Sequence, residues 1–348
     1  MGPISDSQAR AVRAPPSTAD KVRFLSAPQA YAYAPASVSV LETHMSYVFL
    51  AGDRVYKLKK PVRYRSLDFS TIDARERNCR EEVRLNRRLA GEIYLGVVPL
   101  TFSAGHGLAL GGDGEHVDWL VAMRRLPREA MLDRLITEHR LTTARIDALC
   151  DTLADFYRHA ERSSIGPEDY ALRFFREQEK NRDILTRRDF ALDHGRTPVL
   201  LDLLDRRLAL SRAQLQERAL QGYLVDGHGD LRPEHICLRD PIAIFDCLEF
   251  SAELRQVDPF DELAYLGVEC ALIGAKTIGA ELVDKVAQRL SLEPPRRLVA
   301  LYAAWRATLR ARQSVAHLLD AKPREPAKWE PLATRYLNFA EAALGADA

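Results

Sequence analysis

The stretch from Leu224 to Leu238, LVDGHGDLRPEHICL, concentrates titratable side chains between two short apolar segments. A carboxylate on such a loop, Asp230, is suited to accept the proton of an attacking hydroxyl group. A second carboxylate, Asp246, closes the apolar run IAIF and is suited to hold a magnesium ion. These two residue types, one on a loop and one at the end of a strand, predict metal-assisted phosphoryl transfer.

The same chemistry requires a cation near the phosphates, because charge neutralisation dominates phosphoryl transfer. A strand lysine that is fixed by a helical glutamate is a typical arrangement, and Lys57 and Glu82 are the candidates. Lys59 shares the predicted strand face of Lys57, because side chains alternate along a strand, so it stays an alternative. Glu81 is the alternative to Glu82. Its neighbours one helical turn away include arginines, which indicates a solvated face, whereas those of Glu82 include Cys79 and indicate an interior face.

The elements that must position these residues follow from periodicity. Residues 47–60, YVFLAGDRVYKLKK, predict a β-hairpin. Ser70 is expected to begin a helix, with Asp73 as its capping-box partner, and the helix is expected to end near Gly91. Three strand candidates follow (VVPLTFSAG, GLAL and VDWLVAMRRL), and GHGLALGGDG breaks the GxGxxG pattern and is interpreted as a hairpin turn. We therefore expect residues 23–125 to form a small lobe with a five-stranded sheet and one helix.

Helical periodicity dominates the rest of the chain, over residues 128–220 and 258–345. The loop with Asp230 lies between them in a short β-island, in which residues 239–241 form a tight turn. Residues 126–348 are therefore expected to form a mostly helical lobe that carries the catalytic loop and the acceptor site. The predicted fold class is α+β with two lobes.

The composition limits the class of protein. The chain has 348 residues, 47% hydrophobic residues and a formal net charge of +1. This length is sufficient for two lobes with a sizeable core. The near-neutral charge argues against a nucleic-acid partner that depends on a global positive field. No apolar run approaches the ~18–20 residues that cross a bilayer, so we expect no membrane association.

The cysteines and the amino terminus indicate the compartment. The five cysteines are scattered and form no CxxC pair, which favours reduced thiols in a cytoplasmic protein over disulfides or a zinc site. Residues 1–22 lack the apolar core of a secretory signal and are expected to form a flexible tail. An organelle transit peptide is the alternative interpretation of this segment.

Several motifs resemble one superfamily, and they occur in its order. HGDLRPEH is similar to the catalytic loop of aminoglycoside phosphotransferases, choline kinases and, more distantly, protein kinases. DCLE, which begins at Asp246, resembles their Asp-x-x-Glu metal motif, and DPFDELA, which begins at Asp258, resembles the Asp-Pro-x-x-Asp-Leu-Ala segment of aminoglycoside phosphotransferases. ETHMSYVFL, VYKLKKPV and EEVRLNRRLAGEIYLGVVP look like one bacterial branch of aminoglycoside phosphotransferase family proteins. The resemblance covers residues 25–320 and is most specific around 40–100 and 224–264.

The resemblance implies a protein-kinase-like fold with ATP and magnesium as cofactors. It implies Asp230 as the catalytic base and Asp246 as a metal ligand. Lys57 becomes the lysine that contacts the phosphates, and Glu82 becomes its partner.

Further roles are implied for residues around these four. Arg232 occupies the position where protein kinases place a lysine near the transferred phosphate. His228 and Asp261 match positions that brace the catalytic loop without touching substrate. The segment Val121-Ala122-Met123 falls where the interlobe hinge offers backbone groups to adenine, so Val121 and Met123 are expected contacts of the nucleotide.

His235 departs from the pattern, because these families place Asn there as a ligand of the second metal. Magnesium prefers oxygen ligands, so the imidazole is less suited to this task. Catalysis with one magnesium or with manganese, nucleotide binding by a pseudokinase with a regulatory or scaffolding role, and an oxygen supplied by Glu234 or Glu249 are the open outcomes. The metal candidates are therefore Asp246, His235 and Glu249. We expect retained catalysis, because the base, the metal carboxylate and the lysine are present.

Other patterns have an ordinary structural interpretation that we favour. Asp258 and Asp261 begin a predicted helix, where the macrodipole favours carboxylates. A tryptophan and three arginines within residues 305–312 are suited to a basic pocket for an anionic acceptor, but their spacing favours an amphipathic packing helix. These residues are Trp305, Arg306, Arg310 and Arg312.

The sequence thus predicts an ATP-dependent phosphotransferase that moves the γ-phosphate to a hydroxyl group of a small molecule. No motif identifies the acceptor or the oligomeric state. A third hypothesis is a metal-dependent hydrolase, which leaves Lys57 without a role. Its candidate residues are His228, Asp230, His235 and Asp246.

Overall fold

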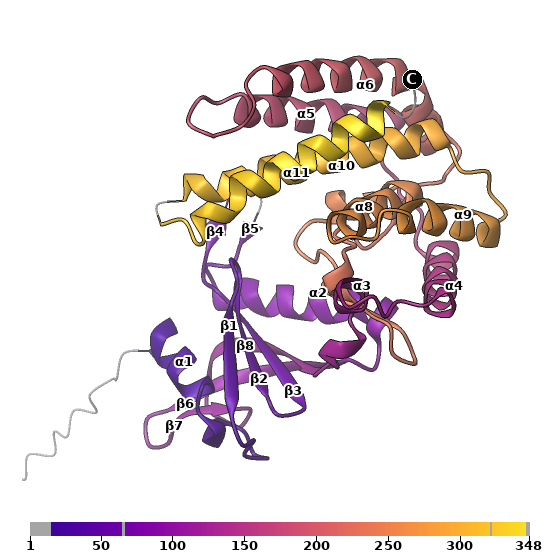
Figure 1. The fold of residues 1–348 in the computed structure, drawn as a ribbon. Coiled ribbons are helices and arrows are strands. Elements are labelled where there is room, and N and C mark those ends of the chain that lie inside the picture. The colour runs from indigo at the N-terminus through magenta and orange to yellow at the C-terminus, as the bar shows by residue number, and fades with distance from the viewer. Residues whose placement is uncertain (1–14, 65–66, 321, 346–348) are drawn as a thin grey trace, which may run out of the picture. The chain divides into compact units, whose positions relative to one another are not determined.

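The computed structural model describes residues 15–64, 67–320 and 322–345. The chain divides into two compact units (Figure 1). The first unit consists of Met1–Arg87 and Gly91–Leu126, and the second of Arg88–Ala90 and Pro127–Ala348. Each unit is described by itself below.

An antiparallel six-stranded sheet with the order β1-β2-β3-β8-β6-β7 forms the first unit. Its strands are β1 (Val38–Glu42), β2 (Ser46–Ala51), β3 (Arg54–Lys59), β6 (Tyr94–Ser103), β7 (Gly107–Leu110) and β8 (Glu115–Arg124). The two-residue strands β4 (Arg63–Tyr64) and β5 (Leu67–Asp68) pair separately. The expectation of five strands was wrong, because β1 is mostly exposed and pairs along one edge only, so its hydrophobic signal is weak.

The predicted hairpin is confirmed as β2 and β3. Phe49 pairs with Tyr56 across the hairpin, and Gly52 provides a positive φ of 58° in its turn. Phe49 and Tyr56 belong to the hydrophobic core of the unit, together with Leu100 and Leu120. The strands predicted after the helix are confirmed as β6, β7 and β8, and β8 occupies a central place in the sheet.

Helix α1 (Thr18–Leu25) covers part of a segment that we expected to be a flexible tail. Ser17 and Asp20 form a capping box, and Lys21 Nζ lies 2.8 Å from Asp118 Oδ2 in a buried ion pair. A cap and a buried salt bridge fix this helix, so the expectation was wrong for residues 18–22. Residues 1–14 lie outside the described part of the chain. The short 3₁₀ helix η1 (Pro28–Ala30) follows.

Helix α2 (Ile72–Ala90) begins one residue later than predicted. Thr71 is its N-cap and accepts a hydrogen bond from Ala74 N–H, whereas Ser70 N–H donates to Asp68 Oδ1 at 2.9 Å. The expected capping box at Ser70 was therefore wrong. The expected end of the helix is confirmed, because Gly91 is its C-cap.

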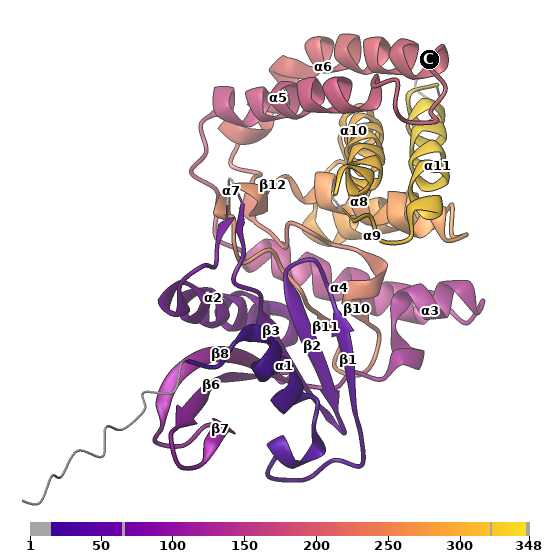
Figure 2. The same ribbon diagram turned by 90° about the vertical axis from the view of Figure 1, so that its left-hand side faces the viewer.

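The second unit is mostly helical, as predicted. Its α-helices are α3 (Leu132–Thr137), α4 (Thr143–His159), α5 (Pro167–Leu185), α6 (Arg196–Leu220), α7 (Ala252–Arg255), α8 (Pro259–Leu272), α9 (Ile278–Leu290), α10 (Arg296–Ala316) and α11 (Pro326–Gly345). Figure 2 shows α5 and α6 on one side of α10, and α11 lies beside α10. Helix α10 also packs against α8. Trp305 on α10 donates from Nε1 to the Phe174 carbonyl oxygen of α5 at 3.3 Å. Single-turn 3₁₀ helices are η2 (Arg128–Ala130), η3 (Pro233–His235) and η4 (His317–Leu319).

The predicted β-island consists of two small antiparallel pairs within this helical unit. Strand β9 (Val225–Asp226) pairs with β12 (Gln256–Val257). Strand β10 (Ile236–Cys237) pairs with β11 (Ala243–Ile244) around the turn at residues 239–241. The loop that contains Asp230 therefore has a short strand at each end.

The predicted α+β fold class is confirmed by the strand-rich first unit and the helical second unit. All five cysteines are buried free thiols. Among the described residues, no helix combines the length and the apolar character that a membrane crossing requires.

Candidate functional site

In the first unit, two lysines from β3 contact one glutamate of α2. Lys57 Nζ lies 3.0 Å from Glu82 Oε1, and Lys59 Nζ contacts Glu82 Oε2. Strand alternation places both lysines on the face that α2 covers. The structure therefore brings together Lys57 and Glu82 as the sequence suggested, and it adds Lys59 to the same carboxylate.

The two lysines differ in their access to solvent. The Lys59 side chain is 1% exposed and its Nζ lies 5.4 Å from the centre of the Phe69 ring, whereas the Lys57 side chain is 16% exposed. Lys59 is thus sealed inside the unit, and Lys57 is the lysine with an exposed portion. Glu82 is fully buried, whereas Glu81 pairs with Arg84 on the outer face of α2, so the predicted orientation of these two glutamates is confirmed.

The expected hinge at Val121-Ala122-Met123 lies instead in the middle of the sheet. These residues belong to β8, which pairs with β3 on one side and β6 on the other. Their backbone groups therefore serve the two ladders, and the assignment of Val121 and Met123 as hinge residues with free backbone groups was wrong. The chain leaves the sheet after Arg124, and the boundary between the units falls after Leu126. The continuous β-rich run VDWLVAMRRL gave no signal for where pairing stops.

In the second unit, two side chains donate to the Asp230 carboxylate, one of them neutral and the other positively charged. Tyr265 donates from its hydroxyl group to Asp230 Oδ1 at 3.0 Å, and Arg232 donates from Nε to Oδ2 at 3.1 Å. Burial raises the pKa of Asp230, but the positive charges of Arg232 and Arg310 lower it below its ordinary value. Asp230 is therefore ionised at neutral pH, and its side chain is still 25% exposed.

His228 fastens the start of the same loop. Its Nε2 lies 2.9 Å from the Phe245 carbonyl oxygen, and Asp230 N–H donates to its Nδ1 at 3.3 Å. Because a carbonyl only accepts and an N–H only donates, the ring is neutral with its proton on Nε2. Burial lowers the pKa of His228 to about 4, which agrees with a neutral ring. His228 therefore braces the loop against the residue that precedes Asp246.

His235 forms a second brace of the loop. Its Nδ1 lies 2.9 Å from the Asp230 carbonyl oxygen and must donate to it, and its Nε2 must accept because Arg232, which only donates, lies beside it. Arg232 Nη2 lies 3.0 Å from this Nε2, and Asp246 Oδ2 lies 3.5 Å from it. The nitrogen that faces Asp246 thus already accepts a hydrogen bond from Arg232.

Asp246 has an unusual backbone conformation and a partly exposed carboxylate. Its φ is 63°, in the left-handed region that non-glycine residues rarely adopt, and its side chain is 42% exposed. Its carboxylate fits magnesium as an oxygen ligand. His235 does not fit as a second ligand in this arrangement, because Arg232 occupies its Nε2.

The other metal candidates are placed less favourably. Glu234 pairs with Arg232 Nη1 at 2.8 Å, and Glu249 is half-buried. Among the described residues, no group of three or more His, Cys, Asp or Glu side chains is arranged to hold a metal ion. The structure therefore does not assemble Asp246, His235 and Glu249 into one cage. Magnesium sites commonly use one or two carboxylates together with phosphate oxygens, so a cage is not required.

Two residues of α8 position the loop and were missed from the sequence. Tyr265 holds the Asp230 carboxylate, and the buried Glu262 accepts from Gly229 N–H and from the Tyr157 hydroxyl group, the latter at 3.0 Å. Burial raises the pKa of Glu262. The contacts join segments far apart in the chain, so periodicity gave no signal for them beyond their place in the DPFDELAY segment.

Asp258 and Asp261 have the structural role at the start of a helix that the sequence predicted. Asp258 is the N-cap of α8, accepts from Phe260 N–H at 3.0 Å and pairs with Arg218. Asp261 pairs with Arg306 in a buried salt bridge at 2.6 Å. Asp261 therefore braces α8 against α10, whereas its neighbour Glu262 makes the contact with the loop that contains Asp230.

The arginines of α10 also follow the favoured packing interpretation. Arg310 Nε lies 2.8 Å from Glu269 Oε1 and Arg312 Nη2 lies 2.7 Å from Glu177 Oε2. Each arginine in this group thus has a carboxylate partner on a neighbouring helix.

Arg88, in the last turn of α2, contacts the chain on both sides of the segment from His228 to Asp246. Its Nη1 donates to the Asp226 carbonyl oxygen at 2.7 Å, and its Nη2 donates to the Gly227 carbonyl oxygen at 2.8 Å and lies 3.3 Å from Cys247 Sγ. Arg255 pairs with the Asp226 carboxylate at 2.7 Å. The residues just before His228 and just after Asp246 are therefore held by the same guanidinium group.

Comparison with known proteins finds related chains but no matching family model. Uncharacterised proteins of Mycobacterium bovis and of two strains of Mycobacterium tuberculosis are each 32% identical to the chain over 321 residues. The match covers 87% of this chain and 60% of each relative, so the chain spans about 60% of their length.

Solved structures with the same fold include small-molecule kinases. A choline/ethanolamine kinase family protein from Mesorhizobium loti has a TM-score of 0.54 at 15% identity, and the match covers 94% of both chains. Choline kinase from Cryptosporidium parvum has a TM-score of 0.54 at 11% identity, with 94% of this chain and 96% of that chain covered.

A thermostable mutant of the aminoglycoside phosphotransferase APH(4)-Ia, in a ternary complex with AMP-PNP and hygromycin B, has a TM-score of 0.53 at 11% identity. The match covers 90% of this chain and 94% of that chain. The resemblance that the motifs carried is therefore confirmed at the level of the fold, and the chain has the protein-kinase-like fold of choline kinases and aminoglycoside phosphotransferases.

Proposed function

We propose that the protein is a phosphotransferase that moves the γ-phosphate of ATP to a hydroxyl group of a small molecule. Fold alone does not fix function, so the proposal depends on the site. The observation that carries it is the ionised, partly exposed Asp230 carboxylate, which Tyr265 and Arg232 hold on a loop that is braced from several sides.

Asp230 is proposed to position the acceptor hydroxyl group and to take its proton. The low pKa of Asp230 makes it a weak base, which suits a reaction in which positioning and charge stabilisation dominate. Its contacts with Tyr265 and Arg232 fix the direction in which the carboxylate accepts. Arg232 also carries a positive charge beside Asp230, where it would stabilise charge on the transferred phosphoryl group.

Lys57 and Asp246 are proposed to serve the nucleotide. Lys57, oriented by Glu82, would contact phosphate oxygens, and Asp246 would hold magnesium. A bound magnesium ion would neutralise charge on the β- and γ-phosphates. We move the proposed backbone contact with adenine from Val121 and Met123 to Leu126. It is the last residue of the first unit, and its N–H makes no hydrogen bond within the described part of the chain.

A nucleotide-binding pseudokinase with a regulatory or scaffolding role is the second candidate. The contact between Arg232 and His235 Nε2 favours it, because that nitrogen is not available to a second metal. The two candidates differ in turnover, since both require the nucleotide to bind.

The test compares the wild-type protein with Asp230→Asn on a panel of hydroxylated metabolites, sugars and aminoglycosides, with ADP release as the signal. We expect turnover on one class of acceptor and a fall of at least about 100-fold in Asp230→Asn, while nucleotide still raises its melting temperature. Asp240→Asn is a matched control, because Asp240 is an exposed carboxylate in the same β-island.

Full turnover by Asp230→Asn would remove the centre of the proposal. Nucleotide-induced stabilisation of the wild-type protein without ADP release on any acceptor would favour the pseudokinase.

A further inference from the structure

A hollow with a volume of about 390 Å³ lies in the second unit. Its lining residues come from α6, α10 and α11, and none belongs to the loop from Gly227 to His235. They are Arg207, Leu210, Ser211, Gln214, Arg297, Leu301 and Leu344. Its volume is within the range of small-molecule sites.

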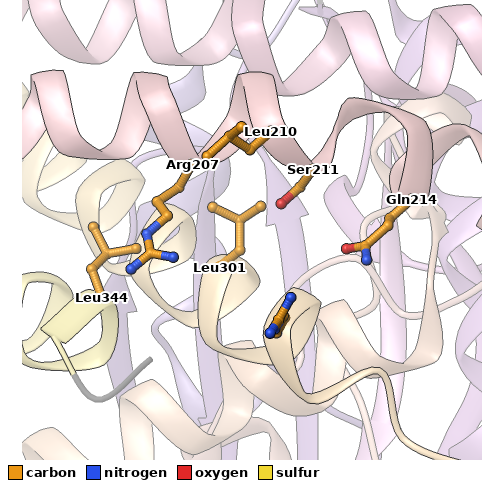
Figure 3. A pocket seen from close by; sticks show the side chains of 7 residues that line it. Arg207, Leu210, Ser211, Gln214, Leu301 and Leu344 are labelled. Atoms are coloured by element: carbon orange, nitrogen blue, oxygen red, sulfur yellow. The ribbon is translucent and has the colours of Figure 1, made fainter. Parts of the chain in front are cut away.

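One face of α6 provides the polar wall of this hollow. Arg207, Ser211 and Gln214 are spaced by four and three residues, so they lie on one side of the helix. Figure 3 shows Ser211 and Gln214 pointing from α6 toward the side of Leu301, whereas Arg207 extends toward Leu344. The wall thus presents a guanidinium group, a hydroxyl group and an amide to the same space.

The side chains of the two arginines that line the hollow have no partner in the part of the chain that the structure describes. Within the described residues, neither the Arg207 nor the Arg297 side chain makes a hydrogen bond or an ion pair, and the Ser211 and Gln214 side chains make none either. By contrast, Arg296, the neighbour of Arg297, pairs with Asp284 at 3.0 Å. Two guanidinium groups from different helices line one hollow, with a hydroxyl group and an amide beside them and no carboxylate among the described lining residues, so the lining has the charge and hydrogen-bonding capacity for an anion.

The position of Arg297 supports the same conclusion. It lies in the first turn of α10, where the helix macrodipole disfavours cations, and this turn contains no acidic residue and no side-chain cap. Its backbone N–H groups therefore remain directed toward the start of the helix. An anion in the hollow would compensate both the arginine and the helix end.

The remaining lining residues are apolar. Leu301 and Leu344 are almost fully buried beneath the hollow, and Leu210 is 80% exposed at its rim. Figure 3 shows Arg207 extending between Leu344 and Leu301. The ligand therefore needs a charged end for the arginines and an apolar part for the leucines.

We propose that this hollow binds a soluble phosphomonoester with a small apolar substituent, at a site separate from the catalytic loop. A phosphate group suits two guanidinium forks, each of which can donate a pair of parallel hydrogen bonds. The site is independent of the proposed transfer reaction, because it uses no residue of that machinery.

The experiment measures binding of phenyl phosphate to the full chain by isothermal titration calorimetry at low ionic strength. We expect saturable binding with a dissociation constant of about 1 mM or below. The double variant Arg207→Gln/Arg297→Gln should weaken it by about tenfold or more. Arg206→Gln is the matched control, because Arg206 is an exposed arginine of the same helix that does not line the hollow, and its affinity should change by less than about twofold.

Further variants separate this site from the catalytic one and from a folding defect. Lys57→Met and Asp246→Asn should leave the affinity for phenyl phosphate unchanged. Arg297 is exposed, so Arg297→Glu alone repeats the test without disturbing the core, and it should abolish binding. Failure of the wild-type protein to bind, or equal binding by Arg297→Glu, would overturn the proposal, whatever the outcome of the turnover assay.

A phosphate group can also belong to a lipid. Vesicles of phosphatidylcholine with and without phosphatidic acid are therefore sedimented with the protein. We expect no difference between the two vesicle types. Sedimentation that requires phosphatidic acid and Arg297, without binding of phenyl phosphate, would overturn the assignment to a soluble ligand.

Discussion

At the residue scale, His235 does most of what an asparagine would do at its position. Its Nδ1–H holds the Asp230 carbonyl oxygen, as an amide N–H would, and its Nε2 faces Asp246 as an acceptor. The difference is that the nitrogen lone pair is taken by Arg232 and is a poor ligand for magnesium. A histidine can thus hold the loop as an asparagine would, while it offers magnesium a poorer ligand.

This comparison predicts the effect of His235→Asn. The variant keeps an N–H donor for the loop and gains an oxygen, so we expect magnesium-dependent ADP formation to rise by about tenfold and the ratio of the rate with manganese to the rate with magnesium to fall. Rates on the cognate acceptor are measured with each metal. His235→Ala is the control, since it removes both functions and should lower the rate. A fall in rate for His235→Asn equal to that of His235→Ala would contradict the interpretation.

His228 predicts a pH dependence of stability. Its pKa is lowered by burial to about 4 in the folded protein, against 6.5 in the unfolded chain. Between these values the unfolded chain binds the additional proton, so stability is full above about pH 6.5 and falls as the pH drops toward 4. The difference between the two pKa values corresponds to about 3 kcal/mol in the free energy of unfolding.

The free energy of unfolding from urea titrations at pH 7 and pH 5 measures this effect. His228→Gln, which cannot titrate, should lose less stability over this interval than the wild-type protein. His106→Gln, at an exposed position, should behave as the wild type. Identical pH profiles for His228→Gln and the wild type would exclude His228 as the source.

At the element scale, the catalytic loop depends on how closely α8 and β12 approach β9. A Cβ atom on Gly227 would lie 2.6 Å from Val257 Cγ2 and 2.8 Å from Glu262 Oε2. Glu262 cannot retreat without releasing Gly229 N–H and the Tyr157 hydroxyl group. The glycine is therefore required by packing.

Gly227→Ala is expected to lower the free energy of unfolding by about 1–3 kcal/mol through overpacking. Gly105→Ala is the control, because a Cβ atom there would meet nothing within 4 Å. Urea unfolding of both variants checks the prediction. Equal stability of the two variants would show that the loop can move away from α8.

The sequence was most informative where a pattern is long or local. The alternation over residues 47–60 was sufficient for the β2–β3 hairpin and for the shared face of Lys57 and Lys59. The sequence was insufficient where the contact that fixes an element joins residues far apart in the chain. The ion pair of Lys21 with Asp118 fixes α1, and the contact of Tyr265 with Asp230 orients the carboxylate. No local pattern encodes either contact.

At the scale of the whole molecule, the chain combines a first unit that holds Lys57 and Glu82 with a second unit that holds Asp230 and Asp246. Helix α2 belongs to both, since Glu82 lies in the first unit and Arg88, less than two helical turns later, lies in the second. Phosphoryl transfer requires both sets of residues on one nucleotide, so binding should depend on each of them.

This dependence can be measured by nucleotide-induced stabilisation. A ligand that binds only the folded protein raises its melting temperature, and we expect a rise of about 5 °C with excess ATP and magnesium. Lys57→Met and Asp246→Asn should each abolish most of this rise, although the residues belong to different units. Lys60→Met is the control, because Lys60 pairs with Glu42 at the edge of the sheet and has no proposed contact with nucleotide. A full rise in Lys57→Met would mean that the nucleotide, if it binds, is held by the second unit alone, and the kinase-like assignment of the first unit would fail.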